Sequence, residues 1–264
     1  MNTSHKVKKS VFIGGKQIGV NCLNVLLEHG IKPDLVICNV GDGEGKKNWH
    51  DSLLNVAEVN NLNYLKNTRV DEFDVIKMIE NISPEIIFCI GGMHIIPKSV
   101  LSIPRLGCVN IHPSLLPKYR GRYSTAHAIF NGEKYSGVTI HWMDEGIDTG
   151  PIIMQEKIEI KDTDTARTLY DKFTKIGTLL FKEFLNLWIT GQKIPSLKQD
   201  ENEASYYPKS LPAGGEIDWS WDGAKIKRFI RAMTFEPFGS ARFKIGNEEM
   251  LIVNKKYVDD SFIK

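Results

Sequence analysis

An unbroken apolar run at residues 86–90 is the sequence feature that most constrains the fold. A strand with one face in water alternates apolar and polar residues, whereas this run contains no polar position. It is typical of a strand in a parallel sheet whose two faces are both covered by helices. Shorter apolar runs at residues 11–13 and 35–38 come before it, separated by amphipathic segments. The sequence therefore predicts an α/β fold with a Rossmann-like, mostly parallel open sheet.

The longest amphipathic segment, at about residues 165–190, ends the first part of the chain and is stopped by Gly191. A polar linker at residues 192–203 follows. Beyond it, we expect a strand edge at 217–219, a helix at 222–233 and a hairpin with strands at 241–245 and 250–253. We therefore expect a large domain at residues 1–191 and a small C-terminal α+β appendage at residues 204–264.

The composition favours a globular protein of the cytoplasm. The four cysteines each lie within an apolar run and form no C-x-x-C pair, which favours buried free thiols in a reducing compartment. The N-terminus is polar and basic without the apolar core of a secretory signal, and no run approaches the ~20 apolar residues of a membrane span. A net charge of +2 does not suggest a nucleic-acid-binding surface. We therefore expect a cytoplasmic protein with no membrane and no nucleic-acid partner.

Two polar side chains share one face of the strand predicted at residues 107–112. Asn110 and His112 point the same way because side chains alternate along a strand, and Pro113 ends the strand directly after them. Asp148 lies in a glycine-bearing loop after another apolar strand, at residues 137–142. Ligands of parallel α/β sheets bind where strands end at their carboxyl edge. An Asn, a His and an Asp that converge there are able to orient a carbonyl, move a proton and hold charge on the imidazole.

The histidines also have plainer interpretations. His112 alone equally fits a core histidine, and His141 lies within its strand, which favours a structural place. His94 follows the 86–90 strand, and its loop leaves both interpretations open. Although His112, His141, Asp144 and Asp148 include common ligand types, they lack the H-E-x-x-H pattern or any other short ligand spacing. We therefore expect no metal site.

A glycine-rich turn at residues 14–19 follows the first strand and opens a helix. A dinucleotide-binding fingerprint would need a glycine where Lys16 stands and an acid near the end of the second strand, where Asn39 stands instead. We therefore interpret the glycines as a tight strand-to-helix turn. Backbone N–H groups and Lys16 at a helix N-terminus are also suited to a substrate phosphate.

Three motifs together resemble the formyltransferase family. They are the run from Asn110 to Gly121, the strand at residues 137–141, and the run from Asp144 to Ile153. Members of that family use 10-formyltetrahydrofolate. The resemblance implies a formyltransferase fold in which residues 1–191 are the catalytic domain, with Asn110, His112 and Asp148 as the catalytic trio.

The same resemblance places the folate pterin between the loops at residues 90–97 and 144–148. A flat pterin needs an apolar slot with a few polar groups, and Met93, Ile95 and Ile96 are suited to its apolar walls. The implied folate-binding residues are Met93, His94, Ile95, Ile96, Asp144, Glu145 and Gly146.

The C-terminal residues resemble one branch of the family, the nucleotide-sugar N-formyltransferases. The resemblance is carried by residues 206–209, 215–219 and 230–232. It implies formyl transfer to the amine of a nucleoside-diphosphate-linked amino-dideoxy sugar, for surface-glycan (O-antigen, lipopolysaccharide) synthesis by a homodimer. By family analogy we favour dTDP-4-amino-4,6-dideoxyglucose or a close relative. The candidate substrate-binding residues are Gly15, Lys16, Arg122, Tyr207, Lys209, Trp219 and Arg231, although Trp219 equally fits an anchor of the small domain.

Three alternatives stay open. A methionyl-tRNA formyltransferase would bind tRNA through phosphate contacts, yet the C-terminal part carries several acidic residues. A metal hydrolase or a non-catalytic folate or nucleotide binder would use parts of the same pattern. The sequence also leaves open which sugar, amine position and base are used, and whether His112 acts mainly as a general base or as an oxyanion stabiliser.

Overall fold

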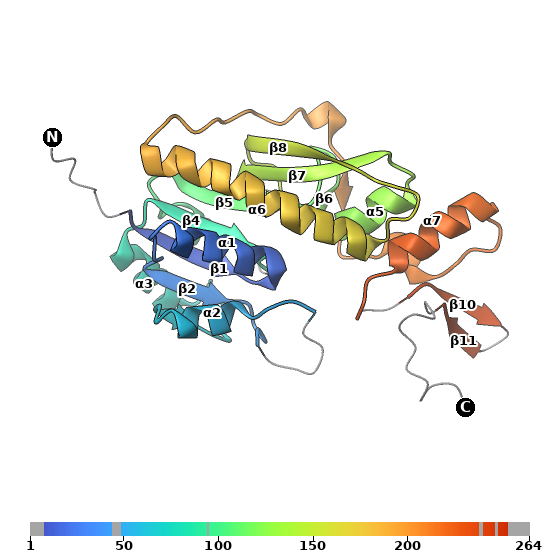
Figure 1. Cartoon of the computed structure of the whole chain (residues 1–264), viewed down its shortest axis with the longest axis horizontal. Helices are drawn as coiled ribbons and strands as arrows, with labels where there is room; N and C mark the ends of the chain where they lie inside the picture. The colour runs from blue at the N-terminus through green and yellow to red at the C-terminus, as the bar shows by residue number, and fades with distance from the viewer. Residues whose placement is uncertain (1–7, 44–48, 94, 238–239, 246–247, 253–264) are drawn as a thin grey trace.

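A computed structural model of the chain describes residues 8–43, 49–93, 95–237, 240–245 and 248–252. Seven strands form one sheet in the order β3-β2-β1-β4-β5-β7-β8 (Figure 1). The first five strands along this order run parallel, while β7 runs antiparallel to both β5 and β8. The predicted fold class, a mostly parallel α/β sheet of Rossmann type, is therefore confirmed. The strands are β1 (Ser10–Gly14), β2 (Leu35–Cys38), β3 (Tyr64–Leu65), β4 (Ile86–Ile90), β5 (Gly107–His112), β7 (Tyr135–Trp142) and β8 (Ile152–Glu159).

Helices cover both faces of this sheet. The apolar cluster on one face includes side chains of α1, α2, α5 and α6, and the cluster on the other face includes side chains of α3 and α4. Ser52 caps α2 and Thr165 caps α6 through their hydroxyl oxygens, and α6 begins where the sequence predicts. The helices are α1 (Lys16–Glu28), α2 (Leu53–Val59), α3 (Phe73–Ile82), α4 (Lys98–Leu101), α5 (Ser124–Phe130) and α6 (Ala166–Thr190).

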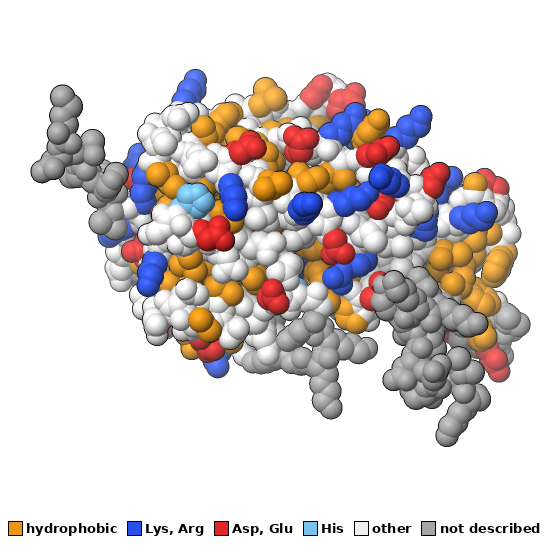
Figure 2. Space-filling view, viewed as in Figure 1, with side chains coloured by type: hydrophobic (Ala, Val, Ile, Leu, Met, Phe, Trp, Pro, Cys, Tyr) orange, Lys and Arg blue, Asp and Glu red, His pale blue; other side chains and the backbone are white. Residues whose placement is uncertain are grey.

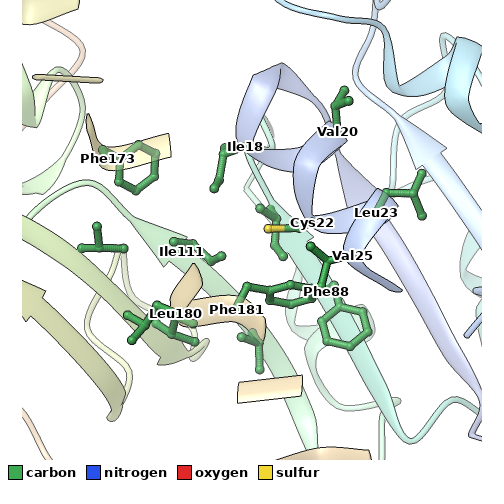
Figure 3. Close-up of a cluster of buried hydrophobic side chains, with 14 of the residues drawn as sticks. Ile18, Val20, Cys22, Leu23, Val25, Phe88, Ile111, Phe173, Leu180 and Phe181 are labelled. Atoms are coloured by element: carbon green, nitrogen blue, oxygen red, sulfur yellow. The ribbon is translucent and has the colours of Figure 1, made fainter. Parts of the chain in front are cut away.

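Strand β4 shows why its sequence is apolar throughout. Phe88 belongs to the cluster under α1 and α6, whereas Ile87 and Cys89 belong to the cluster under α3. Figure 3 shows Phe88 beside Phe181 of α6, and the two rings meet edge-on with centroids 5.5 Å apart. Because both faces of the strand are buried, a polar residue here would lose its water contacts. Each of the four cysteines is buried and free, as predicted.

The C-terminal unit packs its own apolar cluster, which contains Ile217, Phe229 and Met233. It holds helix α7 (Gly223–Met233) and an antiparallel pair of strands, β10 (Arg242–Ile245) and β11 (Glu248–Leu251). The prediction of a strand edge at residues 217–219 is wrong. Its backbone makes only a bridge between Glu216 and Arg242, because Asp218 turns the chain by accepting a hydrogen bond from the Ser220 N–H.

The predicted polar linker lies along the large domain. Leu197 and Ile152 exchange two backbone hydrogen bonds of 2.8 Å, so the linker extends the sheet beside β8. A short helix, η1 (Glu201–Glu203), follows, and then β9 (Tyr206–Tyr207) pairs with β6 (Arg120–Gly121). The chain therefore returns to the carboxyl edge of β5 before it enters the C-terminal unit through η2 (Pro212–Gly215). Within the described ranges, no helix is long and apolar enough to cross a membrane.

Candidate active site

The end of β5 carries the two side chains that the sequence places on one face. His112 is buried and Asn110 is half-buried, while Ile111 between them points into the opposite apolar cluster. Nε2 of His112 lies 2.7 Å from the carbonyl oxygen of Tyr119. The side chains along β5 therefore alternate between the two faces of the sheet, as the sequence predicts.

A loop that folds back after β7 brings Asp148 to His112, an arrangement that the sequence does not predict. Because β7 is antiparallel to β5, its last residue, Trp142, pairs with Val109 and not with the end of β5. The chain then folds back, and Asp148 adopts a left-handed backbone with φ of 56°. Its Oδ2 lies 3.3 Å from Nδ1 of His112 and accepts a hydrogen bond of 2.9 Å from the Gly121 N–H.

His141 completes the cluster, although the sequence favoured a structural place for it. It pairs with Asn110 across β5 and β7, and its Nε2 lies 3.2 Å from Asn110 Nδ2 and 3.5 Å from Asp148 Oδ1. Nδ1 of His141 lies 2.7 Å from the Trp142 carbonyl, so in the neutral ring the proton sits on Nδ1 and Nε2 accepts from Asn110. The Asn110 amide also donates to Asp148 Oδ1 at 3.3 Å.

The charges within this cluster depend on one another. Burial pushes the pKa of Asp148 upward, but His112, His141 and the Gly121 N–H outweigh burial and hold that pKa well below its usual range. Burial lowers the pKa of His112, and the opposing effects of Asp148 and the Tyr119 carbonyl do not cancel it. When His112 is neutral, its proton lies on Nε2 and points at the Tyr119 carbonyl, and its unprotonated Nδ1 faces the Asp148 carboxylate. A proton arriving at Nδ1 is therefore stabilised by Asp148.

The loop after β4 is tied to Asn39, a residue that the sequence does not single out for the site. Asn39, at the end of β2, donates to the Gly91 carbonyl at 3.0 Å and accepts from the Met93 N–H at 3.2 Å. Met93 and Ile95 expose 51% and 78% of their surface, whereas Ile96 exposes 6% and packs in the core. Ile96 therefore does not offer the apolar wall expected of it, and His94 lies outside the described residues.

The second predicted folate loop, at residues 144–148, follows β7. Asp144 accepts hydrogen bonds from the Gly146 N–H at 3.1 Å and from the Thr149 hydroxyl at 2.5 Å, which shapes the turn. Glu145 pairs with Lys98 of α4 at 2.6 Å. Both groups of this pair are exposed, so it adds little stability, but it connects the second loop to the start of α4, directly after the first loop.

Two neighbouring cations are Lys16, at the start of α1, and Arg122, directly after β6. Lys16 is partly buried, and among the described residues it has no hydrogen-bond or ion-pair partner. Burial first, and the neighbouring Arg122 second, lower its pKa. Arg122 donates to the Met93 carbonyl at 3.2 Å. At Gly15 a Cβ would come within 2.5 Å of the Asn39 amide nitrogen, so a larger residue would displace the Asn39 side chain from its bonds to the loop after β4.

The C-terminal candidates are less directly placed. The Tyr207 ring stacks on Tyr119 with centroids 5.2 Å apart and lies 4.1 Å from His127, and its hydroxyl accepts from Asn131. Its ring is therefore already packed within the protein, which differs from the predicted base contact. Arg231 donates to the Asp164 carbonyl at 2.8 Å and so holds α7 to the loop before α6.

Lys209 and Trp219 remain exposed. Lys209 lies two residues after the Tyr206–Tyr207 strand. Trp219 exposes 62% of its surface and touches Phe243 of β10 edge-on, with centroids 5.6 Å apart. Through this contact Trp219 packs against β10 of the C-terminal unit. Among the described residues, no group of three or more His, Cys, Asp or Glu side chains is arranged to hold a metal ion.

Comparison with known proteins gives two family matches. The formyl transferase family matches residues 8–185, and the formyl transferase C-terminal domain matches residues 209–263. A methionyl-tRNA formyltransferase of Clostridioides difficile is 33% identical over 258 residues, which cover 97% of this chain and 82% of the relative. A GDP-perosamine N-formyltransferase of Brucella melitensis is 43% identical over 165 residues, which cover 62% of each chain.

Two solved structures are similar over most of the chain. A sugar 3-N-formyltransferase studied with dTDP and 5-N-formyl-THF has a TM-score of 0.75 at 31% identity, over 92% of this chain and 84% of its own. An N-formyltransferase of Helicobacter canadensis in complex with folinic acid and dTDP-3-aminofucose has a TM-score of 0.72 at 29% identity, over 91% of this chain and 85% of its own.

Proposed function

The chain belongs to the formyl transferase family, and from that premise we propose that it moves a formyl group from 10-formyltetrahydrofolate to the amine of a nucleotide-linked amino sugar. The observation that carries the proposal is the cluster of Asn110, His112 and Asp148 at the end of β5, with Nδ1 of His112 3.3 Å from the carboxylate. This trio is the one that the family resemblance implies.

The acceptor class is supported by the relatives and by the cations of this chain. The two similar solved structures are sugar N-formyltransferases, and the relative at 43% identity acts on GDP-perosamine. A nucleotide sugar brings a pyrophosphate, which needs cationic or N–H donors near the catalytic strand. Lys16 and Arg122 lie together at the N-terminus of α1, where the helix dipole also favours an anion. We propose that Gly15, Lys16 and Arg122 hold the pyrophosphate and that Lys209 approaches the same ligand.

The folate is proposed to lie between the loops at residues 90–97 and 144–148. The exposed side chains of Met93 and Ile95 fit a flat apolar ring, and the second loop offers the polar groups of Asp144, Glu145 and Gly146. This co-substrate supplies an electrophilic formyl carbon when it is bound. No step of the proposal requires a metal ion.

Within the proposed mechanism, His112 acts on the attacking amine and Asn110 acts on the formyl oxygen. We propose that His112 takes a proton from the amine at Nδ1 as the amine nitrogen bonds to the formyl carbon, and that Asp148 and the Tyr119 carbonyl hold the resulting imidazolium. When the bond between the formyl carbon and the folate nitrogen breaks, the imidazolium gives this proton to the departing nitrogen. The Asn110 amide stabilises negative charge on the formyl oxygen, for which one of its hydrogens leaves Asp148 or His141. His141 keeps the Asn110 amide oriented by accepting from it.

The direct test is a formylation assay of the purified protein with 10-formyltetrahydrofolate. The acceptor panel pairs dTDP and GDP with 3-amino and 4-amino dideoxy sugars, and mass spectrometry detects the formylated sugar nucleotide. We expect the highest turnover with dTDP-4-amino-4,6-dideoxyglucose or a close relative. Turnover with none of the panel, alongside efficient formylation of methionyl-tRNA, would reject the acceptor class.

Methionyl-tRNA formylation is the second candidate, because the relative at 33% identity covers nearly the whole chain. Binding of tRNA rests on phosphate contacts and weakens steeply with salt. On the face shown in Figure 2, however, Lys and Arg side chains are interspersed with Asp and Glu. Because the whole chain also has a net charge of only +2, we expect no appreciable affinity for initiator tRNA at physiological salt.

The remaining assignments follow from the same proposal. Residues 1–191 would carry the chemistry, and residues 204–264 would contribute to acceptor binding. The enzyme would work in the cytoplasm as a homodimer, and its product would enter O-antigen or related lipopolysaccharide synthesis. Sedimentation analysis of the purified protein tests the dimer independently of activity.

A further inference from the structure

Gln199, in the linker between the large domain and the C-terminal unit, contacts the catalytic loop directly. It is 4% exposed, whereas its neighbours Lys198 and Asp200 are exposed. Its amide nitrogen donates to the Asp148 carbonyl at 2.8 Å and to the Gly150 carbonyl at 2.7 Å. A buried side chain of the linker thus holds the backbone at Asp148 and at Gly150, two residues beyond it.

The other end of the Gln199 amide is held equally firmly. Its Oε1 accepts from Nε and Nη2 of Arg120 at 3.1 and 2.8 Å. Arg120 is 5% exposed and also donates to both carboxylate oxygens of Glu201 at 2.8 Å. Gln199 thereby uses both of its N–H donors and both acceptor positions, which leaves it a single orientation.

Arg120 lies between two residues whose backbones contact the catalytic pair. The Tyr119 carbonyl lies 2.7 Å from His112 Nε2, and the Gly121 N–H donates to Asp148 Oδ2 at 2.9 Å. A shift of the Arg120 backbone would therefore move an acceptor of His112 and a donor to Asp148 together.

The backbone of Asp148 needs such support. Its φ of 56° lies in the left-handed region, which costs a residue with a side chain free energy unless its surroundings hold it there. Removing the Gln199 donors would leave the Asp148 and Gly150 carbonyls without these partners. The turn is then expected to relax, which moves the carboxylate away from Nδ1 of His112.

We propose that Gln199, oriented by Arg120, is a positioning residue that sets the distance between Asp148 and His112. The domain linker thereby completes the active site. This inference rests on the proposed formyl transfer for its kinetic consequences, but its geometric consequence can be measured without any substrate.

Two variants of Gln199 test the proposal. Gln199→Glu keeps the size of the side chain and its contact with Arg120 but loses both donors to the carbonyls. Gln199→Ala loses all four hydrogen bonds. Gln192→Ala is the matched control, because Gln192 has the same side chain, lies in the same linker and is exposed. Circular dichroism and thermal melts of each variant establish that it folds.

We expect both Gln199 variants to lower kcat at least tenfold while the KM values for folate and acceptor change less than threefold. In the ligand-free protein, NMR titration should show the His112 imidazole titrating at lower pH than in the wild type, because the carboxylate attracts its proton less. Gln192→Ala should match the wild type in both measurements. Wild-type kcat in the Gln199→Glu variant, or an unchanged His112 titration in both folded variants, overturns the proposal. Failure of the wild-type enzyme to formylate any acceptor rejects the proposed function, and the titration still decides the role of Gln199.

Discussion

The Nδ1 atom of His112 and the Oδ2 atom of Asp148 face each other at 3.3 Å, although one residue ends β5 and the other follows a strand that runs in the opposite direction. The contact is enclosed by the Tyr119 carbonyl on one side and the Gly121 N–H on the other. It keeps the carboxylate ionised, because the pKa of Asp148 lies well below its usual range in spite of burial. The following predictions depend on this pair and on the groups around it.

Removal of any one of the three central groups should nearly abolish turnover. We expect His112→Asn, Asn110→Ala and Asp148→Asn each to reduce kcat about a hundredfold or more, as the loss of an acid–base or oxyanion group commonly does. Steady-state formylation assays measure the effect. The exposed Asp162→Asn substitution is the control and should leave kcat unchanged. Turnover near that of the wild type in the His112 variant would reject the mechanism.

Stability should depend on pH through His112. Burial holds its pKa in the folded protein below the value of about 6.5 in the unfolded chain, so the unfolded state binds the proton first as pH falls. The free energy of unfolding should therefore fall as pH drops below about 6.5 and level off below the folded pKa. Urea titrations between about pH 7.5 and about pH 5, which span the unfolded pKa of histidine, measure the slope of the free energy of unfolding against pH. The slope should be smaller in His112→Asn, and an identical slope would contradict this assignment.

Lys16 should affect the acceptor more than the folate. We expect Lys16→Met to raise the KM for the sugar nucleotide roughly tenfold or more, because a desolvated cation–phosphate contact is lost, and to change the KM for folate little. Lys175→Met, at an exposed site on α6, is the matched control. An equal rise in both KM values would place Lys16 outside the pyrophosphate site.

Substitutions of Tyr207 test whether its ring packs within the protein or binds a nucleobase. Because its ring packs on Tyr119 and His127, we expect Tyr207→Ala to lower the free energy of unfolding by roughly 1–3 kcal/mol. Tyr207→Phe loses only the hydrogen bond from Asn131 and should cost about 1 kcal/mol or less. Chemical denaturation gives both values. A rise in acceptor KM with unchanged stability would instead support the stacking on the base that the sequence suggested.

Chelation should leave activity unchanged, whereas a folate analogue should stabilise the fold. Folinic acid, the ligand of one similar structure, is expected to raise the melting temperature by mass action. Dialysis against EDTA followed by the formylation assay tests the first part, and thermal melts test the second. Activity that is lost on chelation and restored by zinc would reverse our judgement on metal.

The sequence predicted those parts of the molecule that depend on local patterns. The apolar run of β4 and the alternation of Asn110 and His112 follow from side-chain direction along a strand, and both are present in the structure. The place of His141 beside Asn110 depends on the direction and register of β7, which no local pattern encodes. The fully bonded amide of Gln199 was equally invisible, because its partners lie about fifty residues or more away in the chain, and a polar residue in a polar segment carries no signal.

The pairing of β6 with β9 has a consequence for engineering. Tyr206–Tyr207 pairs with Arg120–Gly121, the segment whose neighbouring backbone contacts His112 and Asp148, so an exchange of everything after the long helix would also change the surroundings of this pair. A chimaera joined at Gly191 would replace Gln199, Ser205 and Tyr207 with foreign residues and so disturb the chemistry it was meant to preserve. A junction placed after Tyr207 keeps all three residues, and with them the contacts to Tyr119, Arg120 and the Asp148 turn.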